Sequence, residues 1–300
     1  MKIVNTTVEL ARYFPSHVDR VRCMHELGYT GIDLSFFYEN RPDAVFMQPN
    51  WKDEALRLRD YGAEHGIAYL QSHLPSGNPL TDPGLQELNK RCIEVCGILG
   101  IPTAVIHAGA WAGMEKKEFF ERNAEYVRQL LPVLEANHVT LCQENSASSY
   151  RNTSYFFFTG SSLAEFCEYV DHPLVGACWD TGHANMEGPQ HDEILALGKH
   201  LKAIHLNDNY GVTDDHLLPF MGTMNVDAVM TALKEVDFRG PFTLEADGVL
   251  RPAGSRLSKR RPFAADTRLA DPPLEVMKAH LRNSYEVARA ILKAYDLPED

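Results

Sequence analysis

The sequence predicts an α/β protein, a (β/α)₈ TIM barrel that forms a single domain over residues 1–300. Short β-rich or apolar runs alternate with longer helical patterns from one end to the other, which is typical of a parallel sheet built from βα units. The chain has 300 residues, 44% of them hydrophobic, and α/β barrels of about 250 residues plus insertions commonly fold as one unit. No low-complexity tract or linker interrupts the alternation, so we expect no domain boundary.

Eight runs of the chain are strand candidates, because each is short, apolar or β-rich and followed by a longer helical pattern. In chain order they are Lys2–Thr6, Gly31–Ser35, Ala68–His73, Thr103–His107, Thr140–Glu144, Val175–Asp180, Leu201–Leu206 and Pro241–Glu245.

The intervening segments carry apolar residues at the 3.6-residue period of an amphipathic helix. The clearest stripes are Leu88, Cys92, Val95 and Leu99; Phe120, Ala124, Val127, Leu131 and Leu134; and Met277, Leu281, Ala288 and Leu292. Two long connections, Phe36–Asn50 and residues 246–273, break the rhythm. Both follow the carboxyl ends of strands, where barrels carry their active-site loops.

The second long connection contains a basic run in an otherwise acidic protein. Its members are Arg251, Arg256, Lys259, Arg260, Arg261 and Arg268. We interpret this run as a solvated surface loop or a subunit contact, because charge runs are usually solvated; a lid that binds an anionic substrate is the alternative.

Charge and hydropathy limit the classes of partner. With 29 Lys and Arg against 41 Asp and Glu, the formal net charge is −12. Such a chain would repel a phosphate polyanion, so nucleic acid is not an expected partner. The first residues lack the apolar run of a signal peptide, and no segment approaches the roughly 20 apolar residues that span a bilayer. We therefore expect a soluble, cytoplasmic protein with no membrane partner, and leave a homo-oligomer open.

The cysteines are expected to be buried thiols. None of the six stands in a Cys-x-x-Cys spacing, and thiols are common fillers in barrel strands. A catalytic role for Cys142 or Cys178, which lie close to the motifs described next, is the less favoured alternative.

Six successive strand candidates carry an ionisable residue at their carboxyl end. These residues are His73, His107, Glu144, Asp180, His205 and Glu245. A parallel barrel brings the carboxyl ends of all its strands to one rim, so residues far apart in sequence become neighbours there. Carboxylates and imidazoles packed together would repel one another or stay unpaired, and a divalent cation resolves that conflict.

Three carboxylates and one imidazole, Glu144, Asp180, Glu245 and His205, form an oxygen-dominated ligand set. This set favours manganese, magnesium or cobalt over a structural zinc site. We expect one divalent ion, Mn²⁺ in the first place, with Mg²⁺, Co²⁺ or Zn²⁺ as alternatives. Taken alone, Glu144 could cap a helix, Asp180 could begin an Asx turn before Gly182, and Glu245 could pair with a following arginine.

A second group of residues surrounds the first. His183 lies three residues after Asp180, and Gly182 permits the tight turn that folds this imidazole back over the rim. Asp214 and His216 follow in the loop beyond the seventh strand. The residues expected to bind substrate hydroxyls are His73, His107, His183, Asp214 and His216. Further metal ligands are the alternative role for them.

The order and spacing of these motifs resemble the xylose isomerase-like TIM barrel superfamily, and within it the sugar phosphate isomerase/epimerase family, over nearly the whole chain. The strings that carry the resemblance are Gly28-Tyr-Thr-Gly-Ile-Asp33, Val105-Ile-His107-Ala-Gly109, Gln143-Glu144-Asn145, Trp179-Asp180-Thr-Gly-His183, Ala203-Ile-His205-Leu-Asn-Asp208 and Leu244-Glu245. The resemblance implies that Glu144, Asp180, His205 and Glu245 ligate a single divalent ion. It also implies that the two glutamates serve as acid/base groups.

The loop after the seventh strand departs from the patterns of the superfamily's branches. Ketose 3-epimerases place an arginine shortly after the seventh-strand histidine, whereas the sixth residue after His205 is Gly211. The run Asp214-Asp-His216-Leu-Leu-Pro219 resembles a branch of sugar isomerase/epimerase homologues in which Gly-x-Gly follows the proline, but here only Gly222 is present. A simple free-ketose epimerase is therefore not the first expectation.

The function implied by the resemblance is a metal-dependent isomerase or epimerase of a small carbohydrate or sugar derivative. It would remove a proton α to a carbonyl, pass through an enediolate and return the proton. Loss of a β-substituent would instead give a lyase or dehydratase on a keto-sugar or keto-inositol. A non-catalytic barrel subunit is a third alternative, which the complete ligand set disfavours.

An alternative from a different class is the tri-zinc apurinic endonuclease, which the superfamily also contains. Its pattern asks for the residues His73, His107, His183, Asp214 and His216, all of which are present. The acidic chain argues against it, because residues 36–50 and 74–83 offer only Arg41 as a cation to hold a DNA backbone.

Overall fold

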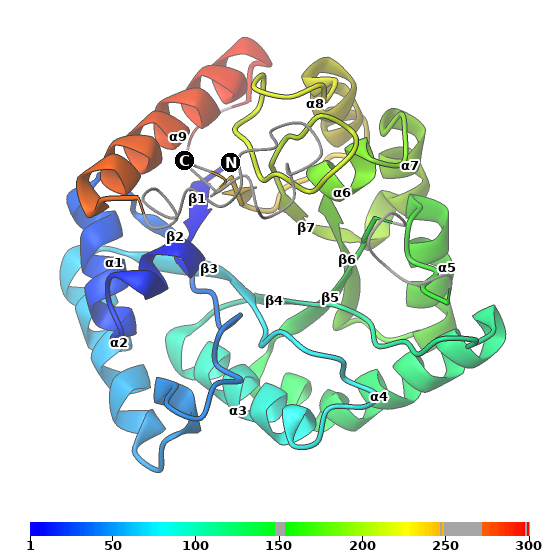
Figure 1. The fold of residues 1–300 in the computed structure, drawn as a ribbon, viewed down its shortest axis with the longest axis horizontal. Helices are drawn as coiled ribbons and strands as arrows, with labels where there is room; N and C mark the ends of the chain where they lie inside the picture. Colours follow the sequence, from blue (N-terminus) through cyan, green and yellow to red (C-terminus); the bar gives the residue numbers. More distant parts are fainter. Residues whose placement is uncertain (148–153, 247, 249–271, 298, 300) are drawn as a thin grey trace, which may run out of the picture.

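The strands form a parallel barrel. The computed structural model describes residues 1–147, 154–246, 248, 272–297 and 299. Its eight-stranded sheet has the order β7-β6-β5-β4-β3-β2-β1-β8 (Figure 1). The strands are β1 (Ile3–Thr6), β2 (Gly31–Asp33), β3 (Ala68–His73), β4 (Thr103–Ile106), β5 (Thr140–Glu144), β6 (Val175–Asp180), β7 (Leu201–His205) and β8 (Phe242–Leu244).

The sheet closes between β7 and β8, just beyond the last residue of β7. The Leu206 amide donates to the Thr243 carbonyl at 2.8 Å, and the Glu245 amide donates to the Leu206 carbonyl at 3.1 Å. Leu206 and Leu244 thereby form a parallel bridge. The predicted (β/α)₈ barrel is confirmed.

Helices surround the strands in Figure 1. They are α1 (His17–Glu26), α2 (Trp51–His65), α3 (Leu85–Leu99), α4 (Lys116–Asn137), α5 (Gly160–Val170), α6 (Thr181–Asn185), α7 (His191–Leu197), α8 (Val226–Glu235) and α9 (Leu274–Ala294), with 3₁₀ helices η1 (Val8–Arg12), η2 (Val45–Met47) and η3 (Gly198–His200). No helix of the described residues is long and apolar enough to cross a membrane.

Local sequence explains where several helices begin and end. Gly66 caps the end of α2 and Gly100 that of α3, with φ angles of 65° and 70°, a left-handed conformation that glycine adopts without steric cost. α5 begins with a capping box in which the Thr159 side chain accepts from the Ser162 amide. Asp180 caps the start of α6, and its carboxylate accepts from the His183 amide at 2.6 Å. The start of α6 therefore fixes Asp180 and His183 relative to each other.

The predicted helical stripes pack on the barrel. Residues Leu88, Cys92, Val95, Phe120, Ala124, Val127, Leu134, Met277, Leu281, Ala288 and Leu292 are buried. Leu99 and Leu131 are partly buried and pack against the same core. The stripes thus cover the outer face of the sheet with apolar side chains.

A small apolar layer of Val105, Cys142, Cys178 and Ala203 lies on strands β4 to β7. Side chains alternate along a strand, so Cys142 shares a face with Glu144, and Cys178 shares one with Asp180. All six cysteines are buried and free of disulfides, as expected. Burial raises the pKa of Cys178 to about 12 and that of Cys142 well above its usual value. Neutral thiols are poor nucleophiles, which disfavours a catalytic role for either.

The first long connection is tied to the barrel by a buried carboxylate. Glu39 accepts from the Phe46 amide at 2.8 Å and lies 2.8 Å from His17 Nε2, between α1 and the loop. The basic run predicted for the second connection lies outside the described residues.

Candidate metal centre

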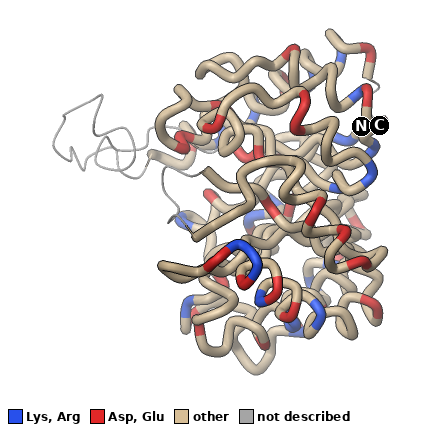
Figure 2. Tube along the Cα trace, turned by 90° about the vertical axis from the view of Figure 1, so that its right-hand side faces the viewer, with Lys and Arg blue, Asp and Glu red and all other residues tan. Residues whose placement is uncertain are grey.

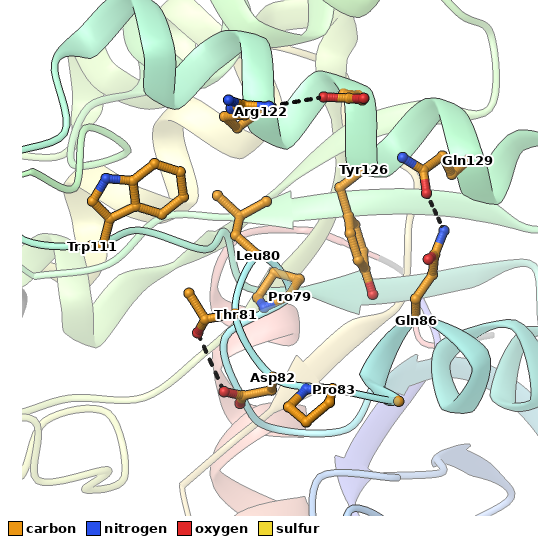
Figure 3. A pocket seen from close by; sticks show the side chains of 12 residues that line it. Pro79, Leu80, Thr81, Asp82, Pro83, Gln86, Trp111, Arg122, Tyr126 and Gln129 are labelled. Carbon is orange, nitrogen blue, oxygen red and sulfur yellow. Dashed lines mark hydrogen bonds and ion pairs between the residues drawn. The ribbon is translucent and has the colours of Figure 1, made fainter.

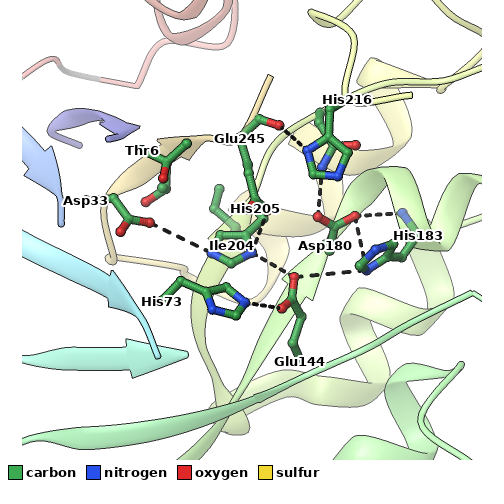
Figure 4. Close-up of polar contacts among 12 residues, drawn as sticks. Thr6, Asp33, His73, Glu144, Asp180, His183, Ile204, His205, His216 and Glu245 are labelled. Atoms are coloured by element: carbon green, nitrogen blue, oxygen red, sulfur yellow. Dashed lines mark hydrogen bonds and ion pairs between the residues drawn. The ribbon is translucent and has the colours of Figure 1, made fainter. Parts of the chain in front are cut away.

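Four strand ends bring their side chains to one point of the barrel rim (Figure 4). β5 ends at Glu144, β6 at Asp180 and β7 at His205, and Glu245 follows β8. One ligand atom from each of these residues lies within 4.8 Å of the others. His205 Nδ1 is 2.7 Å from Glu144 Oε1 and 3.0 Å from Glu245 Oε2. We refer to these residues as the four-residue group.

The four-residue group is enclosed by protein. Glu144 is 1% exposed, Asp180 and His205 are 0% exposed, and the Glu245 side chain is 16% exposed. Glu245 is therefore the member that a molecule entering from the rim can reach most easily.

Two asparagines that the sequence analysis did not single out hold Asp180 in place. Asn207 Nδ2 donates to Asp180 Oδ2 at 2.7 Å. Asn145 Oδ1 accepts from the Asp180 amide at 2.6 Å, and Asn145 Nδ2 donates to the Asp180 carbonyl at 2.9 Å. A Cβ at Gly182 would lie 1.7 Å from Asn207 Oδ1, so glycine is required there. Both asparagines stand one or two residues beyond a strand-end ligand, which is the signal that could have found them.

Glu144 also belongs to a second cluster with His73 and His107. Its Oε2 lies 3.2 Å from His73 Nε2 and 2.7 Å from His107 Nε2. The ligand atoms of this His73–His107–Glu144 group lie within 4.8 Å of one another. The two oxygens of Glu144 thus face two different groups of imidazoles.

A third cluster consists of His183, Asp214 and His216. Asp214 Oδ2 lies 3.6 Å from His183 Nε2 and 3.1 Å from His216 Nε2. His183 Nδ1 lies 3.0 Å from the Asn145 carbonyl, and His216 Nδ1 lies 2.9 Å from the Glu245 carbonyl. A carbonyl oxygen only accepts, so Nδ1 carries a proton in both rings. Nε2 of both rings consequently points toward Asp214.

The carboxylates and imidazoles perturb one another's pKa values. Burial, together with the nearby Glu144 and Glu245 carboxylates, raises the pKa of Asp180 to about 6. Burial alone would raise the pKa of Glu144, but the positive charges of His205 and His107 hold it well below its usual value. Burial alone would lower the pKa of His183, but Asp180 and Asp214 raise it to about 9. Without a cation, protonated imidazoles therefore balance the buried negative charge.

The donor set fits a divalent cation. Three carboxylates and an imidazole nitrogen within 4.8 Å of one another are packed closely enough to share an ion that each approaches to about 2–2.6 Å. Oxygen-rich sets of this kind suit hard or borderline divalent ions. Binding of such an ion would be coupled to the release of protons from the neighbouring imidazoles.

Asp33, the last residue of β2, extends this polar layer on the side away from the other carboxylates (Figure 4). It is 2% exposed, and its Oδ2 lies 4.0 Å from His205 Nε2. Burial raises the pKa of Asp33 to about 6. Asp33 ends the motif Gly28-Tyr-Thr-Gly-Ile-Asp33 but was not among the predicted site residues.

The cleft in Figure 3, about 530 Å³ in volume, lies between the connection after β3 and α4. Several of its polar side chains pair with one another. Gln86 bonds Gln129, Thr81 Oγ1 donates to Asp82 Oδ1 at 3.3 Å, and Arg122 pairs with Glu125 at 3.6 Å. The side chains of this cleft are distinct from the three groups around Glu144.

The chain belongs to the family described as "Xylose isomerase-like TIM barrel", which it matches over residues 21–262. This match confirms the family resemblance drawn from the strand-end motifs.

Curated relatives match parts of the chain. The uncharacterized protein y4fM of Sinorhizobium fredii is 27% identical over 173 residues, 53% of this chain and 51% of that protein. An L-ribulose 3-epimerase of Methylomonas sp. is 32% identical over 91 residues, 29% of each chain. A probable endonuclease 4 of Cenarchaeum symbiosum is 27% identical over 172 residues, 51% of this chain and 59% of that protein. The chain thus spans between about a third and three fifths of the length of these relatives.

Solved structures match almost end to end. D-psicose 3-epimerase from Clostridium cellulolyticum H10, determined with D-tagatose, has a TM-score of 0.72 and 19% identity, covering 97% of this chain and 99% of that one. The IOLI protein with a zinc atom has a TM-score of 0.73 and 18% identity, covering 98% and 99%. At these identities the likeness establishes the barrel fold.

Proposed function

We propose that this protein is a divalent-metal-dependent isomerase or epimerase of a sugar or sugar derivative. The observation that carries the proposal is the convergence of Glu144, Asp180, His205 and Glu245, whose ligand atoms lie within 4.8 Å of one another. These are the residues that would hold the ion. A divalent cation there would polarise a substrate carbonyl and its neighbouring hydroxyl, which lowers the pKa of the α-proton.

Glu245 and Glu144 are the proposed proton-transfer groups. Their carboxylates contact the same nitrogen, His205 Nδ1, from two different strands, with distances of 3.0 and 2.7 Å. β5 and β8 stand three positions apart in the closed barrel, so the two carboxylates can approach a bound molecule from different directions, which suits removal of a proton on one face and its return on the other. Return to the neighbouring carbon would give isomerisation instead of epimerisation.

The surrounding imidazoles and carboxylate are the proposed substrate-binding groups. His183, His73, His107, Asp214 and His216 form a polar wall beside the four-residue group. Polar groups arranged in this way can hydrogen-bond the several hydroxyls of a carbohydrate. The carbohydrate names of the similar proteins, L-ribulose, D-psicose and D-tagatose, support this substrate class.

Manganese is the proposed ion, because three of the four ligands are carboxylates. The zinc atom of the IOLI protein supports a divalent metal in this barrel family, with zinc among the alternatives. We further propose that this protein is cytoplasmic, folds as one domain and binds a small carbohydrate.

The His73–His107–Glu144 and His183–Asp214–His216 groups favour a second candidate, a tri-zinc phosphodiester hydrolase acting on damaged DNA. Together with the four-residue group they provide three ligand clusters in one rim. The relative described as probable endonuclease 4 supports this candidate.

Charge argues against that second candidate. Arg41 is the sole Lys or Arg of the rim loops 36–50 and 74–83, and its guanidinium lies over the Tyr38 ring at 4.2 Å. Figure 2 shows basic residues interspersed with acidic ones along the described trace. DNA affinity depends mainly on contacts between cations and phosphates, so we rank the carbohydrate function first.

Metal analysis and hydrogen exchange together test the proposal. The purified protein should bind one divalent ion per chain and, with that ion, exchange the α-hydrogen of one member of a panel of ketoses, ketose phosphates and keto-inositols with solvent deuterium. A chelator should abolish the exchange. Three zinc ions per chain with cleavage of an abasic-site duplex would establish the second candidate. Exchange accompanied by loss of water would identify a dehydratase.

A further inference from the structure

The Asp33 carboxylate lies on the Nε2 side of the His205 ring. It ends β2 on the opposite side of the imidazole from Glu144 and Glu245, as Figure 4 shows. Nδ1 of His205 contacts the two glutamates, and Nε2 lies 4.0 Å from Asp33 Oδ2. The His205 ring therefore lies between the two glutamates on one side and the buried Asp33 carboxylate on the other.

A chain of buried side chains orients that carboxylate. Thr243 Oγ1 donates to Gln71 Oε1 at 3.2 Å, so the Gln71 amide presents its Nε2 to Asp33 Oδ2 at 3.4 Å. Thr243 and Gln71 are both 0% exposed. Gln71 thus supplies a donor to one side of the carboxylate, which leaves the remaining acceptor positions for a second donor.

Two atoms of this arrangement have no hydrogen-bond partner within the described part of the chain. They are Asp33 Oδ1 and His205 Nε2. A buried carboxylate oxygen and a buried imidazole nitrogen without partners are both costly. Nε2 lies 4.0 Å from the other oxygen, Oδ2, so a displacement of about 1 Å brings this donor and the carboxylate to hydrogen-bond distance.

We propose that Asp33 is a positioning residue that accepts the Nε2–H bond of His205 and so directs the Nδ1 lone pair at the divalent cation. The inference rests on the metal site of the proposed function. A neutral imidazole carries one proton, so a partner that holds this proton on Nε2 leaves Nδ1 as the ligand atom. Carboxylates that bond the far nitrogen of a metal-bound histidine orient the ring and make it a better ligand.

Cys178 is the other side chain near His205 that needs consideration. Its Sγ, a His205 ring nitrogen and a Glu144 oxygen lie within 4.8 Å of one another. A thiol is a weak acceptor, whereas a carboxylate is a strong one. Cys178→Ser should therefore leave the metal affinity close to that of the wild type.

The test is the metal affinity of Asp33→Asn, measured for Mn²⁺ and Co²⁺ by competition with a chelating dye. The asparagine oxygen can still accept from Gln71 and His205, but it lacks the negative charge that strengthens the bond from Nε2–H, so we expect Kd to rise by about 10- to 100-fold. The absorption spectrum of bound Co²⁺ should also change, because it reports the ligand geometry. The melting temperature of the metal-free protein should stay the same or rise, since a buried unpartnered carboxylate oxygen is removed.

Glu39→Gln is the matched control. Glu39 is another buried carboxylate beside a histidine: it lies 2.8 Å from His17 Nε2 and accepts from the Phe46 amide, instead of contacting the four-residue group. Glu39→Gln should lower the melting temperature and leave the affinity for both ions unchanged. The double variant Asp33→Asn/Gln71→Glu restores a donor–acceptor pair with the carboxylate at the other position, and it should recover part of the lost affinity.

Wild-type affinity and an unchanged Co²⁺ spectrum in Asp33→Asn would overturn the inference while leaving the proposed function intact. If the wild type bound neither ion, the proposed metal site would fail and this inference with it. Should Asp33→Asn not fold, Asp33→Ser removes the carboxylate with a smaller side chain and is subject to the same criterion.

Discussion

Glu144 contacts three imidazoles of the candidate site. Its Oε1 lies 2.7 Å from His205 Nδ1, and its Oε2 contacts His73 and His107 at 3.2 and 2.7 Å. Glu245, by contrast, contacts His205 through Oε2, and its side chain is 16% exposed. A proton-transfer group must reach the substrate, so Glu245 is better placed as the base, whereas Glu144 is better placed as a ligand that links the clusters.

Glu245→Gln should therefore separate proton transfer from metal binding. The carboxamide keeps the size and one oxygen for coordination but cannot act as a base, so turnover should fall at least about 10²-fold while metal content falls far less. Two quantities are measured: the rate of solvent-deuterium exchange at the substrate α-carbon and the metal content of the protein. Glu144→Gln is the control that should lose metal. Unchanged exchange in a fully loaded Glu245→Gln protein would remove Glu245 from the mechanism.

His183→Ala distinguishes the two candidate functions. If His183 binds substrate, the variant should keep the single ion and lose turnover by about 10²-fold or more, as when one hydrogen-bond donor at a reacting oxygen is removed. Metal content by elemental analysis and the exchange rate report the two properties separately. Loss of one bound ion out of three would instead place His183 among the ligands of a third metal.

The residues missed by the sequence analysis were hidden for identifiable reasons. The second strand was expected to continue to Ser35, which placed Asp33 inside it, whereas β2 ends at Asp33. Had the boundary been drawn there, Asp33 would have joined the series of ionisable strand ends. Asn145 and Asn207 were not predicted because they are not ionisable, although their neutral amides orient Asp180.

At the scale of elements, the strands were predictable to within one or two residues. β3, β5 and β6 have the predicted bounds, and β4, β7 and β8 each end one residue earlier than expected. The local sequence determines where a strand forms, but the last residue of the strand depends on which residues hydrogen-bond to the adjacent strand. The three clusters around Glu144 could not be separated from sequence, because side-chain direction at the rim depends on the loops.

The short helix α6 links the backbone to the four-residue group. Asp180 caps it, and Asn207 packs against Gly182 so closely that a Cβ there would lie 1.7 Å from Asn207 Oδ1. Gly182→Ala should displace Asn207 and with it the 2.7 Å bond to Asp180 Oδ2. We expect a loss of about 1–3 kcal/mol in unfolding free energy from overpacking, and a weaker affinity for Mn²⁺.

The cap of another helix provides the control for that variant. Thr159→Ala removes the capping box of α5 and should cost about 1 kcal/mol without changing the affinity for Mn²⁺. Denaturant unfolding and dye competition measure the two effects. If Gly182→Ala lowered stability but bound Mn²⁺ like the wild type, α6 would be a packing element that does not control the position of Asp180.

At the scale of the whole molecule, the barrel follows from its alternating pattern, since parallel strands need helical crossovers and eight such units can close on themselves. Closure gathers the ends of β5 to β8 at one rim, which explains why residues about 100 positions apart, Glu144 and Glu245, share a site. The order of these motifs was sufficient to identify the family, which the match over residues 21–262 confirms.

A buried pair on the outside of the barrel should make global stability depend on pH. His17 of α1 is 0% exposed, and its Nε2 lies 2.8 Å from Glu39 Oε1. Burial, aided by the charge of Arg20 and opposed by Glu39 and Glu54, lowers the pKa of His17 below 6.5. The unfolded chain therefore binds a proton at this residue at a higher pH than the folded chain does, so the contribution of His17 to stability falls as the pH drops below about 6.5.

His17→Gln should remove that contribution. Between pH 7 and pH 5, the unfolding free energy of the metal-free wild type should decrease more, or rise less, than that of the variant, because only the wild type has to keep a buried imidazole neutral in acid. Urea unfolding of both proteins in the presence of a chelator measures the unfolding free energy at each pH. The rim histidines are common to both proteins, so their contributions cancel in the difference. The pair joins α1 to the 36–50 loop and does not contact the four-residue group, so Mn²⁺ affinity at pH 7 should be the same in both proteins. Parallel stability curves over this range would show that the folded barrel accommodates the protonated His17 as readily as the unfolded chain does.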